Sequence, residues 1–557
     1  MSNAKPWLKS YPKGIPEFIA ELSYDSVAEM LENACKKHAN RTAFVNFGKS
    51  ISYAQLDEYS RDLAAFLQSR FKKGDAVSIM MPNLLQYPIA VFGILRAGLV
   101  VTNTNPLYTP PELKHQLNDA KAKAIIVIEN YACTLAEIVN ETPIEQVITT
   151  QIGDLLGLKG MFMNFMIKKV KKMVPDFSID NTLTFKQVLK QGKALSFSKP
   201  EINLQDIAFL QYTGGTTGVS KGAMLTNKNL VANVEQVRTW NAGSLQEGKE
   251  IVITALPLYH IFALNANCLL FSEYGAKNIL ITNPRDMAGF VKELSNHKFT
   301  AMTGVNTLFN GLLNTEGFDQ LDFSNFRFAL GGGMAVQKDT ATRWKKITGV
   351  TLVEAYGLTE TSPAACMNPA NLEEYNGMIG LPISSTECEI RDDDGNKMPV
   401  GERGELCIRG PQVMKGYLNR PDATAETIDQ DGWLLTGDIA VMNEQGFFKI
   451  VDRKKDMILV SGFNVYPNEI EDAVCLHANI IEAAAIGIPD AKSGEVVKLF
   501  VVVKQSMSVD DVKKHCRENL TGYKIPRHIE FREELPKSNV GKILRKDLRA
   551  EELSKNS

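Results

Sequence analysis

The chain has 557 residues, which is more than one hydrophobic core usually holds, so we expect two or more domains. Hydrophobic residues make up 44% of the chain and charged residues 23%, which is typical of a globular protein in water. The formal net charge of −2 offers no electrostatic basis for nucleic-acid binding, so we expect no nucleic-acid partner.

The N-terminal residues and the cysteines predict a cytoplasmic protein. Residues Met1 to Trp7 lack the apolar core of a signal peptide, and no run of 18 apolar residues predicts a membrane-spanning helix. The eight cysteines are scattered, without a C-x-x-C pair or a Cys/His cluster. Such usage is typical of reduced, mostly buried thiols.

Residues 155–175 form a basic segment without an acidic residue. Its apolar residues recur at helical spacing, which places the lysines on the other face of a predicted helix. A basic amphipathic helix can lie on an anionic membrane, here the inner face of the cell membrane. The alternative is a surface helix that packs its stripe on the core. The lysines are Lys159, Lys168, Lys169, Lys171 and Lys172, and the stripe is Met163, Met166, Ile167, Val170, Met173 and Val174.

A predicted buried strand at residues 206–211 runs directly into a segment rich in glycine and hydroxyl groups. Glycines let backbone N–H groups approach closely, and successive N–H groups form an anion-binding concavity. A lysine in the segment adds a positive charge. The pattern therefore predicts a polyphosphate site and the use of a nucleoside triphosphate. The segment is Tyr212, Thr213, Gly214, Gly215, Thr216, Thr217, Gly218, Val219, Ser220, Lys221 and Gly222.

The residues around Lys221 differ from the common NTPase loop, in which Gly-Lys is followed by Ser or Thr. Here Ser220 precedes the lysine and Gly222 follows it. This mismatch argues against a P-loop motor or GTPase. The remaining alternative from composition alone is a turn that joins a strand to a helix.

From about residue 40 to 385, apolar strand-like runs alternate with helical patterns, which predicts parallel sheets covered by helices. From about 385 to 450, short runs with Asp-Gly turns predict antiparallel strands in a small β-barrel-like subdomain. After Asp452, the order hairpin, helix, strand, strand, helix, strand predicts a compact α+β unit. The expected fold class is therefore α/β with these two additions. The predicted strands of the first region include 124–129, 206–212, 251–255, 278–282, 301–305, 326–330 and 351–355.

Further motifs follow the glycine-rich segment along the chain, and together they resemble, in order, the signatures of the adenylate-forming superfamily. The resemblance covers about residues 25–550. Residues 83–88, 105–109 and 452–471 carry a finer resemblance to the bacterial long-chain fatty-acid–CoA ligases. The motifs are Tyr356-Gly-Leu-Thr-Glu-Thr361, Thr436-Gly-Asp438, Asp452-Arg-Lys-Lys-Asp456 and Pro536-Lys-Ser-Asn-Val-Gly-Lys-Ile543.

The resemblance implies a ligase that uses ATP, Mg²⁺ and CoA. It would join a long-chain fatty acid to AMP, release pyrophosphate, and then transfer the acyl group to CoA. It also implies an adenylation domain at residues 1–452 and a mobile C-terminal lid at 453–557, with a hinge at 453–455. Dimers occur in the superfamily, so a homodimer is open, although no segment encodes a recognisable interface.

By resemblance, Lys542 bridges the carboxylate, the ribose and the α-phosphate during adenylation. Glu360 ligates Mg²⁺ together with Thr213, and Thr359 contacts the α-phosphate. His260 follows a predicted strand and is placed near the reacting carboxylate. A lone histidine among apolar residues is otherwise a core residue, so the positioning role rests on the resemblance.

The nucleotide site is expected around Asp438, which would accept hydrogen bonds from the ribose hydroxyls. Arg453 resembles a second ribose contact, and Tyr356 is expected near adenine. The set expected to bind ATP or CoA is Tyr212, Thr213, Gly214, Gly215, Thr216, Thr217, Gly218, Lys221, Gly332, Gly333, Tyr356, Gly357, Asp438, Arg453, Lys455 and Gly462.

The acyl and CoA sites are also placed by resemblance. Apolar residues 261–270 and 304–309 lie where the superfamily has its acyl tunnel, and they favour a long alkyl chain. Leu264 stands where some relatives carry a gating tryptophan, so an aromatic gate is not expected there. Lys455 resembles the hinge position and Gly462 would line the pantetheine channel. The absence of an insertion between them favours a complete CoA ligase.

Two alternatives stay open. One is another adenylate-forming enzyme, such as an aryl-acid–CoA ligase or an acyl-AMP ligase. The other is a lipid-binding homologue without activity, against which the presence of Lys542, Glu360 and Asp438 argues.

Overall fold

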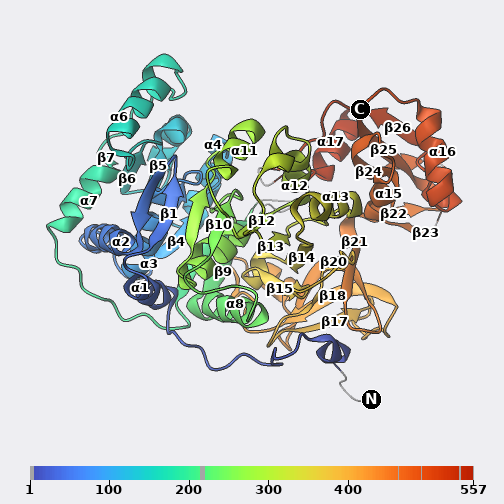
Figure 1. Ribbon diagram of the computed structural model, residues 1–557, viewed down its shortest axis with the longest axis horizontal. Coiled ribbons are helices and arrows are strands. Elements are labelled where there is room, and N and C mark those ends of the chain that lie inside the picture. The colour runs from blue at the N-terminus through green and yellow to red at the C-terminus, as the bar shows by residue number, and fades with distance from the viewer. Residues whose placement is uncertain (1–4, 214–219, 462, 491, 539–540, 556–557) are drawn as a thin grey trace.

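The computed structural model describes residues 5–213, 220–461, 463–490, 492–538 and 541–555. Two large sheets covered by helices occupy most of the molecule (Figure 1). A smaller antiparallel sheet follows them, and a C-terminal α+β unit lies beside it. This arrangement confirms the α/β class expected from the alternating pattern.

The first large sheet has the strand order β19-β9-β8-β4-β3-β5-β6-β7. Its strands from β8 to β7 are parallel, whereas β9 and β19 are antiparallel additions. Every residue of β3, β4, β5 and β6 is buried, as expected for parallel strands covered on both faces. The bounds are β3 Ala76–Met80, β4 Val100–Asn103, β5 Ala124–Ile128, β6 Gln146–Thr150, β7 Leu183–Thr184, β8 Ile207–Thr213, β9 Lys221–Thr226 and β19 Gly416–Tyr417.

The second large sheet has the order β16-β15-β14-β13-β12-β10-β11-β1-β2. Its strands from β14 to β1 are parallel, and β2, β15 and β16 are antiparallel at the two edges. The predicted strands of this region are confirmed to within a few residues. The bounds are β1 Thr42–Asn46, β2 Lys49–Ser52, β10 Ile251–Thr254, β11 Lys277–Leu280, β12 Ala301–Gly304, β13 Phe328–Gly331, β14 Leu352–Gly357, β15 Ala364–Met367 and β16 Leu381–Pro382.

Helices pack on both sheets, and one hydrophobic cluster contains residues of both, including Phe44, Ile126, Phe209, Phe271 and Leu352. Several helices start with reciprocal side-chain caps, as at Ser52 and Gln55 of α2. The main helices are α1 Val27–Lys37, α2 Tyr53–Gln68, α3 Gln86–Arg96, α4 Pro110–Asp119, α5 Ala132–Ala136, α6 Gly157–Phe165, α7 Phe185–Lys193, α8 Asn227–Trp240, α9 Ile261–Ala263, α10 Phe271–Glu273, α11 Met287–Leu294, α12 Asn306–Leu313, α13 Lys338–Thr348 and α14 Pro421–Thr427. Shorter turns of 3-10 or π helix that matter below are η4 Met166–Val170, η5 Leu264–Leu270, η7 Thr359–Thr361 and η8 Lys454–Asp456.

The antiparallel strands expected after residue 385 form a four-stranded sheet of order β17-β18-β20-β21. The C-terminal unit has its own apolar cluster, which includes Ile470, Val497 and Val512. Its order of elements confirms the predicted one, with a final helix added. The bounds are β17 Glu387–Arg391, β18 Arg403–Arg409, β20 Leu434–Met442 and β21 Phe448–Arg453, then β22 Ile458–Val460, β23 Phe463–Val465, α15 Pro467–Cys475, β24 Ile480–Asp490, β25 Gly494–Val503, α16 Val509–Asn519, β26 His528–Phe531 and α17 Arg545–Lys555.

The basic segment is helical, with α6 continuing into the π turn η4, and it lies at the periphery of the molecule beyond β6 and β7 (Figure 1). Met163 packs against the core, but much of the apolar surface faces solvent. The exposed apolar side chains are Leu158, Met161, Phe162, Phe165, Val170 and Met173. Within the described ranges, no helix is long and apolar enough to cross a membrane.

Candidate functional site

The candidate site lies where several parallel strands of the second sheet end. His260 follows β10, Thr307 follows β12, Gly332 and Gly333 follow β13, and Tyr356 lies near the end of β14. Carboxyl ends of neighbouring parallel strands share one edge of a sheet, which is where open α/β sheets bind ligands. The chain therefore collects residues that are far apart in sequence at one edge.

The glycine-rich segment closes an antiparallel hairpin, because Thr213 of β8 pairs with Lys221 of β9 and Tyr212 with Gly222. The alternative of a direct strand-to-helix turn is therefore wrong. The hydroxyl of the buried Tyr212 donates to Asp119 at 2.8 Å. The predicted phosphate contacts Gly214, Gly215, Thr216, Thr217 and Gly218 lie outside the described residues.

Lys221, Tyr417 and Glu360 form a chain of contacts beside this hairpin. The Lys221 ammonium lies 5.0 Å from the centroid of the Tyr417 ring. The Tyr417 hydroxyl donates to Glu360 Oε1 at 2.6 Å, and burial and the adjacent carboxylate raise the pKa of Tyr417. Strand β19 brings Tyr417 here because it pairs with Ala223 of β9. Sequence reasoning missed Tyr417, since its contacts depend on that long-range pairing.

Tight packing fixes the turn that carries Thr359 and Glu360. A Cβ at Gly357 would lie 1.9 Å from the carbonyl oxygen of Pro363, so only glycine fits. The main-chain oxygen of Glu360 accepts from Met414 N at 2.8 Å, and that of Thr359 accepts from Ser362 N at 3.2 Å. The turn thus presents the Glu360 carboxylate toward Tyr417.

Asp438 is buried and is held on both carboxylate oxygens. Tyr356 donates its hydroxyl to Oδ2 at 2.6 Å, and Arg453 Nε lies 3.3 Å from Oδ1. Burial first, and then the Asp438 charge, raise the pKa of Tyr356, so this hydroxyl stays a donor. The structure brings together three residues that the sequence assigned to the nucleotide.

Lys542 reaches the same place from the C-terminal unit. Burial, and then the positive charge of Arg453, lower the pKa of Lys542 to about 8, while Asp438 opposes the shift. Its loop is anchored where Thr307 Oγ1 donates to Gly541 O at 3.2 Å. Gly541 has φ of +79°, and Lys542 N donates to Ser538 Oγ at 3.1 Å. The result is a turn, anchored after β12, that carries Lys542 at the strand-end edge.

His260 lies near Lys542 and is neutral at ordinary pH. Burial, and then the Lys542 charge, lower the pKa of His260 to about 4. Its Nδ1 accepts from Phe262 N at 3.3 Å. A neutral imidazole that accepts through Nδ1 carries its proton on Nε2, so Nε2 is a hydrogen-bond donor. The Phe262 ring in turn lies 3.2 Å from where a Cβ of Gly332 would be, and Gly333 has φ of +76°.

The donor set fits Mg²⁺ carried by a polyphosphate. Glu360 offers a hard carboxylate oxygen and Thr213 a hydroxyl at the end of β8. Across the described part of the chain, no three His, Cys, Asp or Glu side chains gather closely enough to hold a metal ion. Mg²⁺ commonly binds one or two carboxylates plus substrate phosphates, so such a cluster is not needed.

Family models match the chain over most of its length. Residues 31–418 match the AMP-binding enzyme family, and residues 469–542 match the AMP-binding enzyme C-terminal domain. The chain belongs to the AMP-binding enzyme family. The matched ranges include Glu360 in the first case and Lys542 in the second.

Curated relatives and solved structures agree with this AMP-binding enzyme assignment. A long-chain-fatty-acid–CoA ligase of Salmonella typhimurium is 57% identical over 551 residues, covering 98% of both chains. One of Haemophilus influenzae is 53% identical and covers 99% of both. The crystal structure of an anthranilate CoA ligase in complex with anthranoyl-AMP has a TM-score of 0.85 at 24% identity, covering 97% of this chain and 99% of that chain. The similarity to the anthranilate CoA ligase structure concerns the fold alone.

Other predicted residues of this AMP-binding enzyme are placed less centrally. Lys455 lies exposed in η8, and burial of its ammonium end and the nearby Arg453 lower its pKa. Gly462 lies outside the described residues. Leu264 is fully buried at the start of η5. The expected apolar segment also contains Asn265 and Asn267, whose amides donate to the carbonyl of Ser362 and to Thr254 Oγ1.

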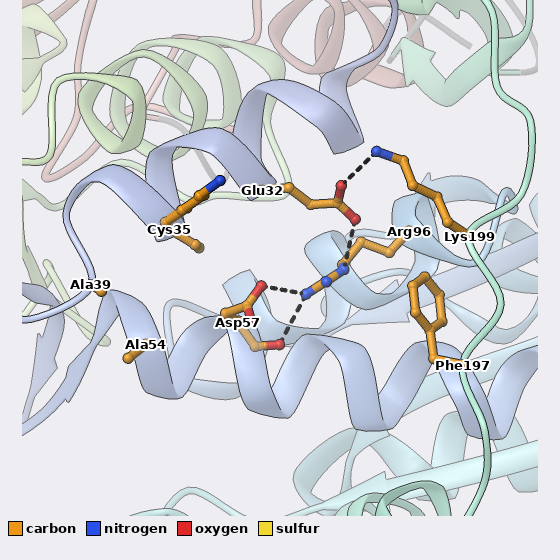
Figure 2. Close-up of a pocket in the computed structure, with 9 residues that line it drawn as sticks. Glu32, Cys35, Ala39, Ala54, Asp57, Arg96, Phe197 and Lys199 are labelled. Carbon is orange, nitrogen blue, oxygen red and sulfur yellow. Dashed lines mark hydrogen bonds and ion pairs between the residues drawn. The ribbon is translucent and has the colours of Figure 1, made fainter.

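A separate cavity of about 530 Å³ opens between α1, α2 and α3 (Figure 2). Arg96 projects into it and binds Asp57 at 2.8 Å and Glu32 at 3.2 Å, while Lys199 binds Glu32 at 3.0 Å. Four charged side chains of this cavity, Arg96, Asp57, Glu32 and Lys199, are thus paired with one another. None of the predicted site residues is among those that line it.

Proposed function

We propose that this chain is a cytoplasmic, ATP-dependent long-chain fatty-acid–CoA ligase. It would convert a fatty acid to acyl-AMP with release of pyrophosphate, and then transfer the acyl group to CoA with release of AMP. The observation that carries the proposal is that Tyr356 and Arg453 hold Asp438 at the strand-end edge where Thr307 anchors the loop of Lys542. The names of the full-length relatives support the choice of substrate.

In the first step, a carboxylate oxygen of the fatty acid attacks the α-phosphorus, and the bond to the β-phosphate breaks. Two anions meet in this reaction, so positioning and positive charge dominate catalysis. Lys542 would neutralise the charge that develops between carboxylate and α-phosphate. His260, with a proton on Nε2, would donate a hydrogen bond to the substrate carboxyl group. Thr359 would contact the α-phosphate.

The nucleotide would be held by the residues gathered at the strand-end edge. Asp438 and Arg453 would bind the ribose, and Tyr356, Gly332 and Gly333 would surround adenine. The glycine-rich hairpin and Lys221 would hold the β- and γ-phosphates and then pyrophosphate. Mg²⁺, bound by Glu360 and Thr213, would neutralise phosphate charge, and Tyr417 would hold Glu360 in place.

In the second step, the thiol sulfur of CoA attacks the acyl carbonyl carbon, AMP leaves, and the thiol proton is released. We expect the C-terminal lid, residues 453–557, to turn about Lys455 relative to residues 1–452 and to bring Gly462 to the pantetheine channel. The acyl chain would lie between residues 261–270 and 304–309.

The test is ATP–pyrophosphate exchange with C2 to C18 acids and aryl acids, followed by thioester formation with CoA. We expect C12–C18 acids to support both, and Lys542→Ala to lower adenylation by about 10²–10³-fold, as for a lost oxyanion donor. Lys537, in the same motif, pairs with Glu482 at 2.7 Å, so Lys537→Ala is the matched control. Exchange with aryl acids alone, or acyl-AMP without thioester, would favour the alternative ligases. A lack of exchange with every acid would indicate a binding protein.

We also propose that α6 and η4 contact the anionic inner face of the membrane. Leu158 is 84% exposed and Phe162 68%, and the exposed Lys169, Lys171 and Lys172 follow on the same segment. Apolar insertion beside lysines complements an anionic lipid surface, where an alkyl substrate is also found.

Sedimentation with vesicles tests this contact. We expect binding to phosphatidylglycerol-containing vesicles, weaker binding to pure phosphatidylcholine, and loss of binding in a Leu158→Ser, Phe162→Ser variant. Leu476→Ser, at a residue 60% exposed on the C-terminal unit, is the control. Equal binding of both variants would contradict the contact. A homodimer remains a prediction, which light scattering checks.

A further inference from the structure

Arg545 lies at the first position of α17, three residues after Lys542, and every nitrogen of its guanidinium group has an acceptor. Nε and Nη2 donate to the two oxygens of Glu471 at 2.9 and 2.6 Å. Nη1 donates to Asp452 at 3.2 Å and to Asp456 at 3.4 Å, and Nη2 also donates to Asn468. The side chain is only 14% exposed. Such a complete bidentate arrangement fixes both position and orientation of an arginine.

One of these contacts differs from the others in where it lies along the chain. Asp456, Asn468 and Glu471 belong to the C-terminal unit, as Arg545 does, so those contacts hold the unit together. Asp452 precedes the expected hinge at 453–455 and belongs to β21. Arg545 therefore joins the loop of Lys542 to the last strand of the four-stranded sheet.

Asp452 is wholly buried, and its carboxylate is held from three directions. Oδ1 accepts from Arg453 N at 2.7 Å and from Arg545, while Oδ2 accepts from Asn468 N at 2.7 Å. Burial raises its pKa to about 6 even though Arg545 opposes the shift. A buried carboxylate without its cation is strongly unfavourable, so Asp452 stabilises the arrangement only while Arg545 is seated on it.

The contact leads directly to the nucleotide site. Arg453, next to Asp452, pairs with Asp438 across β20 and β21. A continuous path of contacts and short chain segments thus links Lys542 to the nucleotide site. It runs from Lys542 through Arg545, Asp452 and Arg453 to Asp438. Apart from it, the contacts of the C-terminal unit with the body include Thr307 with Gly541 and Arg403 with Glu469 at 2.8 Å.

We propose that Arg545 is a positioning residue that locks the C-terminal unit onto Asp452 with Lys542 in the site, and that this lock opens before the thioester step. The inference rests on the proposed function, because it assigns the lock to the adenylation half-reaction. The lock adds no group to the reacting atoms. It sets how often Lys542 is in place.

The experiment measures the two half-reactions separately in the full chain. Arg545→Gln should lower ATP–pyrophosphate exchange on the order of 10–100-fold, the effect of losing hydrogen bonds to charged groups. Thioester formation from supplied acyl-AMP and CoA should stay within about threefold of wild type, since the lock is open in that step. Arg545→Lys, which keeps the charge but not the fork, should recover part of the exchange.

Two further variants keep the test decisive. Asp452→Asn removes the body side of the lock and leaves Arg545 bound to Glu471, Asp456 and Asn468, so it should show the same split if Arg545→Gln does not fold. Arg549→Gln is the matched control, because Arg549 lies one turn further along α17 and its ion pair is with Asp456 at 2.8 Å, inside the C-terminal unit. It should show no split. Equal losses in both half-reactions, or none, in Asp452→Asn would overturn the lock.

A substrate-free readout separates this inference from the proposed function. Trypsin cleavage after the exposed Lys454 and Lys455 should be about tenfold faster in Asp452→Asn than in wild type or Arg549→Gln, because the hinge backbone opens more often when the unit is unlocked. If wild type is inactive toward fatty acids but the cleavage difference is present, only the proposed substrate is wrong. If wild type is active toward fatty acids but Asp452→Asn is cleaved no faster than wild type, only the proposed lock is wrong.

Discussion

The Tyr417 hydroxyl donates to the Glu360 carboxylate at 2.6 Å, so the residue expected to ligate Mg²⁺ is oriented by a tyrosine from a different sheet edge. The same ring faces the Lys221 ammonium. One aromatic side chain thus contacts both the carboxylate that we propose for the metal and the cation that we propose for the phosphates. Its contribution can be measured apart from both charges.

We expect Tyr417→Phe to lower kcat/KM for MgATP about 10-fold or more, since a hydrogen bond to a charged group is lost. The Mg²⁺ concentration for half-maximal rate should rise as well, because Glu360 loses its orientation. Pyrophosphate exchange over a Mg²⁺ titration measures both. Tyr11→Phe, whose hydroxyl donates to the carbonyl of Pro382, is the control and should leave the Mg²⁺ dependence unchanged.

The pH dependence of adenylation should report Lys542. Its pKa is lowered to about 8, so the ammonium carries its charge below that pH and loses it above. We therefore expect kcat/KM for ATP to fall above about pH 8, approaching tenfold per pH unit. His260, with its pKa lowered to about 4, stays neutral from pH 6 to 9 and adds no step there. A flat profile from pH 7 to 9.5 would contradict the assignment.

Gly357→Ala should damage both folding and activity. The new Cβ would lie 1.9 Å from the Pro363 carbonyl oxygen, so the turn that carries Glu360 has to move. We expect a loss of about 1–3 kcal/mol of stability, as for other overpacked sites, with adenylation reduced further. Thermal unfolding and pyrophosphate exchange measure the two effects. Gly522→Ala, where a Cβ would meet nothing within 4 Å, should change neither.

The buried Glu354 should make the free energy of unfolding depend on pH. Burial raises its pKa to about 8, although the hydrogen bond from Tyr375 opposes the shift. The folded chain then keeps a proton that the unfolded chain releases above about pH 4.3. Stability from this residue is therefore full below that pH and declines as pH rises toward 8.

Glu354→Gln removes this titration, so its free energy of unfolding relative to wild type should rise between pH 5 and 8, by an amount on the order of a few kcal/mol at most. Denaturant unfolding at several pH values measures this difference. A difference between the two proteins that is constant with pH would contradict the raised pKa. Asp431→Asn, in an exposed turn, is the control.

Local patterns predicted much of the fold and part of the site. The apolar runs gave the strands of both sheets because buried parallel strands need continuous apolar residues. They did not show that β1 and β2 join β11 in the second sheet rather than β3 to β7 in the first, since pairing partners are set by tertiary packing. Tyr356, Asp438 and Arg453 were named from motifs, whereas Tyr417 and Arg545 act through contacts that no local pattern contains.

The basic segment shows a second limit. A stripe that includes Val170 and Met173 assumes one continuous α-helix, but the chain turns into a π helix at Met166. A π turn has a wider hydrogen-bond span than an α turn, so the helical period shifts within the segment. The structure leaves both residues exposed, and it turns Leu158 and Phe162 outward as well.

The hairpin of β8 and β9 has a consequence for how phosphate charge is balanced. Many nucleotide sites seat a phosphate at a helix N-terminus, where the dipole and free N–H groups attract it. Here the glycine-rich segment lies between two strands, and α8 begins only at Asn227, after β9. If this hairpin binds the phosphates as proposed, their charge is balanced by the Lys221 side chain rather than by a helix dipole. Raised ionic strength should then hasten release of pyrophosphate by screening Lys221.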